Sequence, residues 1–491
     1  MVVLVYSRFF PHNCTVENAR FTKRRFLLSA INRLIAVLRM HTEGTAHPVD
    51  EVKHMSNRDD MMNNWSQQNR RYVPAALFFV LLIYWVAIFS VNIPYLDEWA
   101  TVVPLMDNDS PTLSELWKQH NEHRIFFPKL LILANIHLSH WDVRWQMMCS
   151  LMLAGMTFLV IAAHIRKYEK QRGQPLPPFL WCITPLLIFS FAQYENWLWG
   201  FCVSWQMAEL AVVLGFSFLV KWRDTLSGKD FLLALLCGIV ATFSMGQGLV
   251  YWPVGALLLL AVPQHHWKHF AVWCLVFLAV IIAYFADYTE PEHHINVHGV
   301  TDLHGLRYIL QYPHEYLLFV LTFIGNAVTF PVIGGAILAG ILGGYVFIMN
   351  IRRYRDKQLQ FFFLLAIYGL LSAFMIGIGR TELHFVTATS SRYISLGVLF
   401  WVALLVITAD KRTWYRGAVA IGICASVGYL VGILWSAELH QRRAAAQQHI
   451  LMRYPSALDA DMEKIVCCPY GENMQDLLSV LARKKLSLFR E

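Results

Sequence analysis

The sequence predicts an all-α polytopic membrane protein with about eleven transmembrane helices, and three observations lead to this fold class. The 491 residues are 56% hydrophobic and only 15% charged, with a mean hydropathy of +0.43, so polar surface is too scarce for a soluble protein of this size. Apolar runs approaching the ~20 residues of a membrane span recur along the chain. Alternate loops between these runs are basic, as the positive-inside rule requires of cytoplasmic loops. The formal net charge of +8 therefore indicates topology rather than a nucleic-acid partner.

Residues 1–71 differ in composition from the rest of the chain. The first 72 residues carry eleven Lys and Arg, and their apolar run from Phe26 to Leu38 is short and broken by Arg33, so it cannot span a membrane. Two interpretations remain. The segment is either a basic cytoplasmic arm lying on anionic lipid, or upstream sequence that is not translated, with Met55 or Met61 as the true start. We favour the second and assign the segment no function.

Residues 72–435 form the predicted transmembrane domain, with the amino end cytoplasmic and the carboxyl end outside. The Arg70-Arg71 pair before the first span sets this orientation. Residues 436–491 form an outer tail about two helices long. The predicted spans are Tyr72–Asn92, Trp145–Ile165, Pro178–Ala192, Phe201–Val220, Phe231–Met245, Tyr251–Val262, Phe270–Tyr288, Ile333–Asn350, Phe361–Gly379, Ile394–Ala409 and Gly417–Trp435.

Three further apolar segments are not predicted to cross. Leu113–Gln119 and Ile125–Leu138, in the first outer loop, are too short to cross a membrane or contain too many polar residues. We expect both to lie in the membrane interface. Tyr312–Phe330 is apolar, but a full span there would place the basic loop 351–357 outside, against the positive-inside rule. We therefore expect Tyr312–Phe330 to be an interfacial or re-entrant helix.

The polar residues with functional character fall on the predicted outer face. The stretch from Asn92 to Lys129 contributes two charged clusters, and later outer loops contribute the rest, whereas the inner loops hold ordinary basic anchors. A transporter would place ionisable residues at mid-depth inside its spans, where this chain has little apart from Glu209. The outer-face residues are Asp97, Glu98, Glu122, His123, Arg124, Glu195, Asn196, Gln247, His293–His298, Arg380, Arg392 and Tyr393.

Four short motifs on this face occur in an order that resembles a known enzyme class. They are DEW at 97–99, HNEHRIFFPKLL at 120–131, QYENWLWGF at 193–201 and SSRY at 390–393. Their order along a first span, interfacial helices and about ten further spans resembles the GT-C class of integral membrane glycosyltransferases. Within that class the chain looks like the bacterial membrane proteins related to phage-type O-antigen glucosyltransferases. The resemblance covers residues 72–435.

The resemblance implies an inverting transfer of a sugar from a polyprenyl-phosphate donor to a cell-surface glycan or glycolipid, such as an O-antigen or lipopolysaccharide. The reaction would take place at the periplasmic face of a bacterial inner membrane. Asp97 matches the catalytic acid position of the family and would deprotonate the acceptor hydroxyl, with Glu98 as its catalytic neighbour. Repulsion between the adjacent carboxylates is expected to raise one of the two pKa values. The resemblance also implies a partner polyprenyl-phosphate sugar synthase and a flippase.

The remaining site residues are expected to bind the substrates. Arg124, Arg380 and Arg392 are candidates for the donor phosphate, because a guanidinium grips phosphate through two hydrogen bonds. His123 and Tyr393 would supplement them, and Glu122 and Asn196 complete the set. We expect no cofactor, although some GT-C enzymes use a divalent cation, since the histidines from His293 to His298 lack a fixed ligand spacing.

Simpler interpretations compete with each of these roles. Asp97-Glu98 suits a solvated helix-ending turn, Arg392-Tyr393 suits an interface anchor, and Glu195-Asn196 suits a helix cap before Leu198, which we favour for that pair. At the level of the whole protein, one alternative is an O-antigen polymerase or ligase, which places its large catalytic loop later in the chain. The other is a lipid-linked sugar flippase or transporter, which needs a polar pathway through the spans.

Overall fold

The computed structural model describes residues 70–107, 111–262, 267–289, 298, 305–411, 413–455 and 474–490. All of them belong to one compact unit, 67–491. Almost all of the amino-terminal segment 1–71 and of the histidine-rich stretch 290–297 lies outside the described residues. Within those that are described, regular secondary structure is helical, apart from a single β-bridge between His120 and His123.

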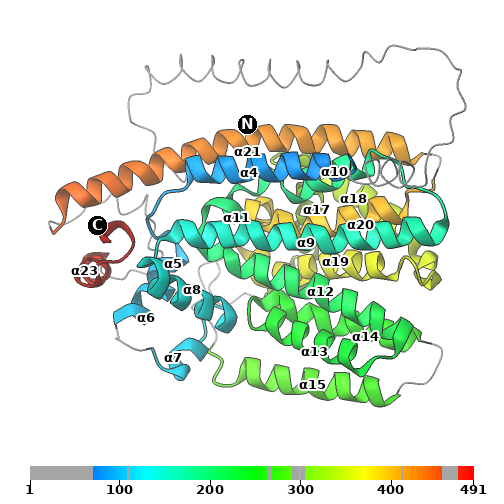
Figure 1. The fold of residues 1–491 in the computed structure, drawn as a ribbon, viewed down its shortest axis with the longest axis horizontal. Coiled ribbons are helices and arrows are strands. Elements are labelled where there is room, and N and C mark those ends of the chain that lie inside the picture. Colours follow the sequence, from blue (N-terminus) through cyan, green and yellow to red (C-terminus); the bar gives the residue numbers. More distant parts are fainter. Residues whose placement is uncertain are drawn as a thin grey trace, which may run out of the picture. The chain divides into compact units, whose positions relative to one another are not determined.

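Long apolar helices lie side by side in the main body of this unit (Figure 1). The helices of this body are α4 (Val73–Phe89), α9 (Val143–Arg172), α10 (Leu180–Ile188), α12 (Val203–Thr225), α13 (Gly228–Thr242), α14 (Tyr251–Ala261), α15 (Trp267–Phe285), α17 (Pro313–Thr329), α18 (Ile333–Asn350), α19 (Gln360–Arg380), α20 (Ile394–Ile407) and α21 (Trp414–Arg453).

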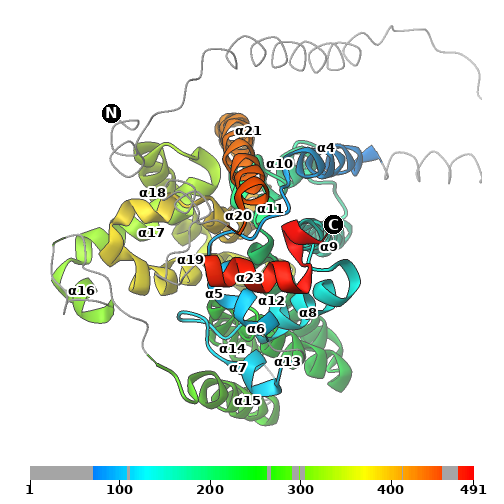
Figure 2. The same cartoon turned by 90° about the vertical axis from the view of Figure 1, so that its left-hand side faces the viewer.

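Short helices make up most of the rest. They are α5 (Asp97–Thr101), α6 (Val103–Asp107), α7 (Leu113–Trp117), α8 (Phe126–Ser139), α11 (Tyr194–Leu198), α16 (Gly305–Gln311) and α23 (Met474–Lys484), with 3₁₀ turns at Phe191–Gln193, Gly200–Cys202, Gly246–Val250, Ile351–Arg355, Thr381–Leu383, Phe385–Thr389, Ser391–Tyr393 and Ser487–Phe489. In Figure 2, which looks at the molecule from one side of Figure 1, α5 to α8 and α23 lie in front of the long helices.

Six helical segments among the described residues are long and apolar enough to cross a membrane, which fits an all-α membrane protein. They are Val143–Arg172, Gly200–Thr225, Trp267–Phe285, Ile333–Arg355, Gln360–Leu383 and Trp414–Arg453. Several other predicted spans form shorter helices. The helix predicted at Pro178–Ala192, for example, is regular only over Leu180–Ile188 and contains Pro185. The predicted total of eleven spans is therefore not established by helix length.

Contacts between loops define one end of the bundle, here called the basic end. Lys167 at the end of α9 pairs with Asp224 at the end of α12 over 3.0 Å, and the neighbouring Arg223 donates to the carbonyl of Lys357, before α19, over 2.9 Å. Arg353, after α18, pairs with Asp410, after α20, over 2.8 Å. Loops that the sequence predicts to be cytoplasmic thus meet at the same end.

The opposite end, here called the site end, gathers the predicted outer loops. Trp199 donates to the carbonyl of Tyr95 over 2.9 Å, and Arg380 at the end of α19 pairs with Glu122 over 3.3 Å. Tyr284, in the last turn of α15, donates to the carbonyl of Glu122 over 2.9 Å. Polar loops from the first half and the second half of the chain are therefore in direct contact there.

Both the first and the last turns of helix α17 contact neighbouring helices in the halves that lie toward the site end. Near its start, the Tyr316 hydroxyl donates to the carbonyl of Phe374 over 2.7 Å, and just after its end the Phe330 ring lies 5.0 Å from that of Trp435. In between, α17 packs so closely on α18 that a Cβ on Gly325 would lie 1.8 Å from the carbonyl oxygen of Ala336, so only glycine fits there. The interfacial or re-entrant path of Tyr312–Phe330 stays a prediction, with which these contacts agree.

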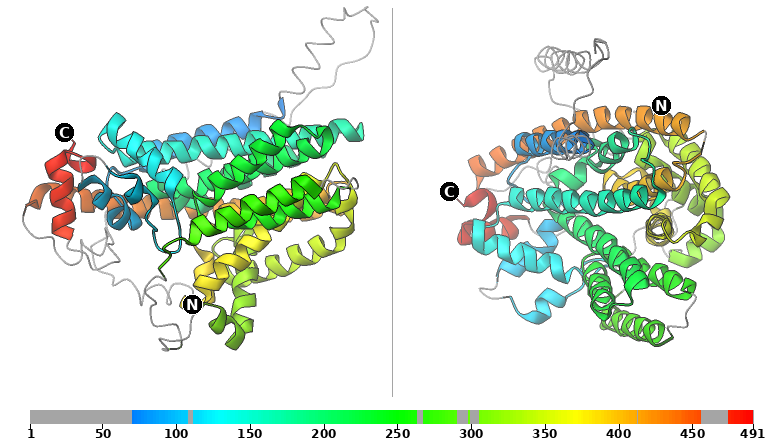
Figure 3. Two further views of the ribbon diagram at one scale, coloured as in Figure 1. Left: turned by 90° about the horizontal axis from the view of Figure 1, so that it is seen from below. Right: turned by 45° about the vertical axis from the view of Figure 1, so that its right-hand side comes forward.

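Helix α21 continues well beyond the predicted last span. It runs for 40 residues to Arg453, which is about 60 Å, twice the ~30 Å of a bilayer core. The tail therefore does not begin with a break at Ser436. Both views of Figure 3 show the far part of α21 together with α23 and the short helices. Arg443, from this extension, donates to the carbonyls of Ile93 over 2.8 Å and Val91 over 3.2 Å, so it fastens the chain that leaves α4.

Candidate functional site

Asp97 is the first residue of α5 and faces a histidine that the sequence analysis did not select. Its Oδ2 lies 3.7 Å from Nε2 of His120, and Nδ1 of His120 bonds the hydroxyl of Thr101, one turn further along α5. His120 is held in place because its backbone pairs with that of His123 on both sides of a tight turn. The HNEH sequence contained a signal for this arrangement, since its first histidine, His120, is nearer in sequence to Asp97 and Glu98 than His123 is.

The charge of Asp97 is stabilised by residues from three parts of the chain. Burial alone would raise the pKa of this carboxyl, but the His120 ring 3.7 Å away and the nearby charges of Arg392 and Arg380 outweigh it and hold the pKa below its ordinary value. Asp97 is therefore ionised at neutral pH. Its side chain is 23% exposed, so a ligand can reach it.

Glu98 points into the protein, away from this surface. Its carboxylate is fully buried, accepts the backbone N–H of Tyr95 over 2.9 Å, and lies directly against Gly200, where a Cβ would be 2.7 Å from Oε1. Burial raises its pKa to about 8, against the opposing charge of Arg443; the charge of Asp97 adds only a smaller part. One pKa of the pair is thus raised, as expected, but the main cause is burial rather than repulsion. A buried Glu98 supports α5 instead of touching a substrate.

We predict that Glu98 makes the protein less stable as pH rises. The folded state holds the proton up to about pH 8, whereas the unfolded chain releases it above its ordinary pKa of 4.5, so unfolding releases a proton between these values. Raising the pH through this window therefore favours unfolding, by up to a few kcal/mol at about 1.4 kcal/mol per pKa unit. Melting temperatures measured from pH 5 to pH 8 should fall in the native protein and fall less in Glu98→Gln. An equal fall in both would contradict this role; Glu438→Gln, at an exposed position on α21, is the control.

Glu122 and Arg380 form a second pair at the site end. They lie 3.3 Å apart, with their side chains 36% and 31% exposed. His123, next to Glu122, packs against Gly246 with 22% of its side chain exposed, and desolvation lowers its pKa to about 4 despite the nearby charge of Glu122. His123 is therefore neutral at neutral pH and adds no positive charge for a phosphate.

Arg124 is engaged by backbone carbonyls rather than placed among the other site residues. Its guanidinium donates to the carbonyls of Tyr284 over 2.5 Å and Trp117 over 2.9 Å, and also to that of Ala286. The residue is only 3% exposed and packs over the Trp117 ring. Arg124 therefore joins the first outer loop to the end of α15, and at 3% exposed its two remaining N–H groups are too enclosed to grip a phosphate.

The QYEN and SSRY motifs bind each other. One carboxylate oxygen of Glu195 accepts the Ser391 hydroxyl over 2.7 Å and the backbone N–H of Arg392 over 3.1 Å. The Asn196 amide donates to the carbonyl of Arg392 over 3.2 Å. The pair that we expected to cap a helix thus holds the loop that carries Arg392, although 196 residues separate the two motifs. Asn196 is fully buried, so its role is to position this loop.

The Arg392 guanidinium packs over two buried aromatic rings. Its central carbon is 5.2 Å from the ring centre of Tyr393 and 5.8 Å from that of Trp199, and its Nη1 is 3.8 Å from Oε1 of Glu195. The Tyr393 ring is itself 3% exposed and stacks on Phe323 at 5.4 Å. Aromatic faces attract and orient a cation. Arg392 is consequently held in one place while its side chain remains 26% exposed.

The structure brings some of the sequence-predicted residues together and leaves others in the interior. Four of these residues are partly exposed and share the site end: Asp97, Glu122, Arg380 and Arg392. The charges of Arg380 and Arg392 act on Asp97, and Arg380 also pairs with Glu122. Glu98, Arg124, Asn196 and Tyr393 lie behind this surface, whereas His123 is 22% exposed, close to the 23% of Asp97, but neutral. In the part of the chain that the structure describes, no three His, Cys, Asp or Glu side chains group in a way that would hold a metal ion.

Comparisons of the chain with protein-family models, with curated proteins and with solved structures found no match. The four motifs and the residues gathered at the site end are therefore the basis for assigning a function.

Proposed function

We propose that the protein is a membrane glycosyltransferase that moves a sugar from a polyprenyl-phosphate donor to a glycan or glycolipid acceptor at the non-cytoplasmic face. The observation that carries this proposal is that Arg380 and Arg392, from the second half of the chain, lie close enough to Asp97, from the first outer loop, for their charges to lower its pKa, at the end of the bundle opposite the basic loops. Under the positive-inside rule the basic end faces the cytoplasm, so the site faces the outside. A bacterial inner membrane is the setting that the motif resemblance implies.

In the proposed reaction, the acceptor hydroxyl oxygen bonds to the anomeric carbon while the bond from that carbon to the donor phosphate breaks. Polyprenyl phosphate leaves from the opposite face of the sugar, so the configuration inverts. Asp97 takes the hydroxyl proton, and because its pKa is low it is a weak base that accepts the proton late, when the new bond has begun to form. His120 orients the carboxylate.

The guanidinium groups of Arg380 and Arg392 would stabilise the phosphate as it leaves. Negative charge grows on the phosphate in the transition state, and fixed cations close to that charge lower the barrier. Glu122 keeps Arg380 in position, and Glu195 with Asn196 does the same for Arg392. This arrangement would allow a lipid-borne donor to react at the membrane surface without a separate soluble domain.

The proposal is tested with the full chain purified into proteoliposomes. The expected result is transfer of labelled hexose from a polyprenyl-phosphate hexose to a glycolipid extracted from the cells that produce the protein. No transfer is expected from a nucleotide sugar. Movement of the donor across the bilayer without formation of a product would instead indicate a flippase and would overturn the proposal.

A further inference from the structure

Arg443 is a buried cation in the part of α21 that continues beyond the predicted last span. It is 2% exposed, and a guanidinium is costly to bury unless its N–H groups are hydrogen-bonded. Arg443 donates to three backbone carbonyls, those of Ile93 over 2.8 Å, Val91 over 3.2 Å and Leu198. It also packs over the Tyr95 ring, 5.1 Å from the ring centre. The four motifs that resemble the GT-C class all end before this residue, so the resemblance assigns it no role.

The three carbonyls belong to the two loops that carry the candidate site. Two of them, on Val91 and Ile93, lie in the segment that leads from α4 to Asp97. The third, on Leu198, lies in the QYENWLWGF motif, whose polar residues hold the Arg392 loop. One guanidinium thus joins the loop of the proposed base to the motif that supports the proposed phosphate ligand.

Contacts between these loops extend the constraint to the reacting groups. Tyr95 donates its backbone N–H to Glu98, in the first turn of α5, over 2.9 Å, and its carbonyl accepts the Trp199 indole N–H over 2.9 Å. The Trp199 ring in turn lies 5.8 Å from the central carbon of Arg392. A shift of the chain beside the buried guanidinium would therefore move Asp97 and Arg392 relative to each other.

The backbone just before Asp97 needs such support. Leu96 has a φ of 50° and a ψ of −122°, a conformation that residues with side chains rarely adopt. A residue stays in such a strained conformation only where the surrounding contacts hold it there. On the amino side of Leu96, Tyr95 packs under Arg443, and on its carboxyl side Glu98 is fully buried. The strained residue is thus held from both directions, which fixes the place of Asp97.

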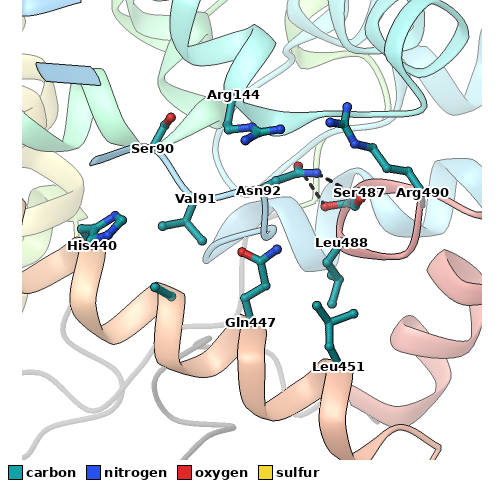
Figure 4. A pocket seen from close by; sticks show the side chains of 11 residues that line it. Ser90, Val91, Asn92, Arg144, His440, Gln447, Leu451, Ser487, Leu488 and Arg490 are labelled. Carbon is teal, nitrogen blue, oxygen red and sulfur yellow. Dashed lines mark hydrogen bonds between the residues drawn. The ribbon is translucent and has the colours of Figure 1, made fainter. Parts of the chain in front are cut away.

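The extension of α21 follows the outgoing chain over about two turns of helix. His440, one turn before Arg443, bonds the carbonyl of Phe89 over 3.0 Å. In Figure 4, His440 and Gln447 project from α21 toward the stretch that contains Val91, with which they line one cleft. Arg443 lies between these two positions along the helix. Its guanidinium is therefore anchored by a rigid element rather than by a flexible tail.

We propose that Arg443 is a positioning residue, which sets the place of Asp97 relative to Arg392 by binding both of the loops that determine it. The extension of α21 is then part of the site rather than an independent tail. Arg443 itself touches no substrate, because its guanidinium is buried against the three carbonyls. What the site does rests on the proposed function, whereas the distance between its two loops is measured without any assay of transfer.

A pair of spin labels tests the geometry in the full chain without native cysteines. The labelled positions are Ala100→Cys, in α5, and Ser390→Cys, in the Arg392 loop. The distance distribution should be single and narrow with Arg443 present. In Arg443→Gln it should shift or broaden by at least about 2 Å, since displacements on the order of 1 Å already alter catalysis. Arg442→Gln removes the same charge from the neighbouring exposed position and should change nothing. An unchanged distribution in Arg443→Gln, or an equal change in Arg442→Gln, overturns the proposal.

Arg443→Lys replaces the glutamine variant in this measurement if Arg443→Gln fails to insert into the membrane. Lysine keeps the buried positive charge, but it presents its N–H groups from a single nitrogen and cannot span carbonyls on two loops as the planar guanidinium does. The distance distribution should change in the same direction, by a smaller amount. In that case a distribution in Arg443→Lys that matches the native one overturns the proposal.

Rates of transfer separate positioning from stability. At equal amounts of inserted protein, Arg443→Gln should lower kcat about tenfold or more, with a smaller change in KM. The acid limb of the pH profile of kcat should also move to higher pH, because the charge of Arg392 that keeps the pKa of Asp97 low would act from farther away.

A residue that served stability alone would reduce the amount of inserted protein and leave kcat and the acid limb unchanged, and that result overturns the proposal. Absence of transfer by the native chain would instead refute the proposed function. The spin-label distances would then still decide whether Arg443 sets the geometry of the two loops.

Discussion

Asp97→Asn is expected to abolish sugar transfer almost completely, by about 100-fold to 10,000-fold, the range that a general base contributes. The amide keeps the size of the carboxylate and an oxygen facing His120, so the geometry of α5 changes little. What it loses is the negative charge that takes the proton from the acceptor hydroxyl. The assay is the proteoliposome transfer of labelled hexose, carried out with equal amounts of membrane-inserted protein.

Asp287→Asn is the matched control for this variant. Asp287 is also at the site end, one residue beyond the Ala286 carbonyl that binds Arg124, but it is exposed. Its backbone has a φ of 53°, in the left-handed region that asparagine tolerates well, so the control introduces no strain. Asp287→Asn should transfer sugar at the native rate. Retention of more than about a third of native activity by Asp97→Asn would remove Asp97 from the mechanism.

Arg392→Gln is expected to lower transfer about 100-fold or more, mainly through the rate of the bound complex. The loop should keep its shape, because Glu195 and Asn196 hold Arg392 by its backbone N–H and carbonyl, which the substitution leaves intact. The loss would therefore report the missing guanidinium rather than a misplaced loop. Arg392→Lys keeps a positive charge and should recover part of the rate, although a single ammonium cannot form the paired bonds.

Arg307→Gln is the control for Arg392. Arg307 is exposed on α16, whose first residue, Gly305, donates its N–H to Glu382 at the site end, so the same charge is removed near the same surface. Donor titrations with each variant separate KM from kcat. A kcat for Arg392→Gln within about threefold of the native value, or an equal fall in Arg307→Gln, would assign Arg392 a purely structural role.

The sequence predicted the arrangement of the bundle better than the lengths of its helices. The positive-inside rule groups basic loops at one end of a membrane protein. The placement of Lys167 and Arg353 at the basic end and of Arg392 at the site end was therefore predictable. The extension of α21 was not, because residues 436–453 are polar and show no membrane signal, while their alanines, glutamines and arginines favour the continuation of a helix. Pro185 and the polar turn after it kept α10 shorter than hydropathy alone implied.

The candidate site could be predicted only in part, for a reason visible at Arg124. Its partners are carbonyls of Tyr284 and Ala286, some 160 residues away, and sequence spacing carries no information about them. The same limit concealed the contact of Glu195 with the Arg392 loop and the support that Arg443 gives to the chain after α4. Charge pattern thus identified the end of the bundle at which the candidate residues gather, whereas tertiary contacts decided which of them are exposed and which are structural.

Residues near Asp97 and near Arg392 are expected to share one non-cytoplasmic face, and labelling of single cysteines with a membrane-impermeant maleimide tests this most directly. In a background without native cysteines, Asn121→Cys and Ser390→Cys mark the site end, and Lys357→Cys marks the basic end. In sealed cells the first two should react and Lys357→Cys should react only after the membrane is opened. Reaction of Asn121→Cys and Ser390→Cys from opposite sides, or of both only together with Lys357→Cys, would contradict the account.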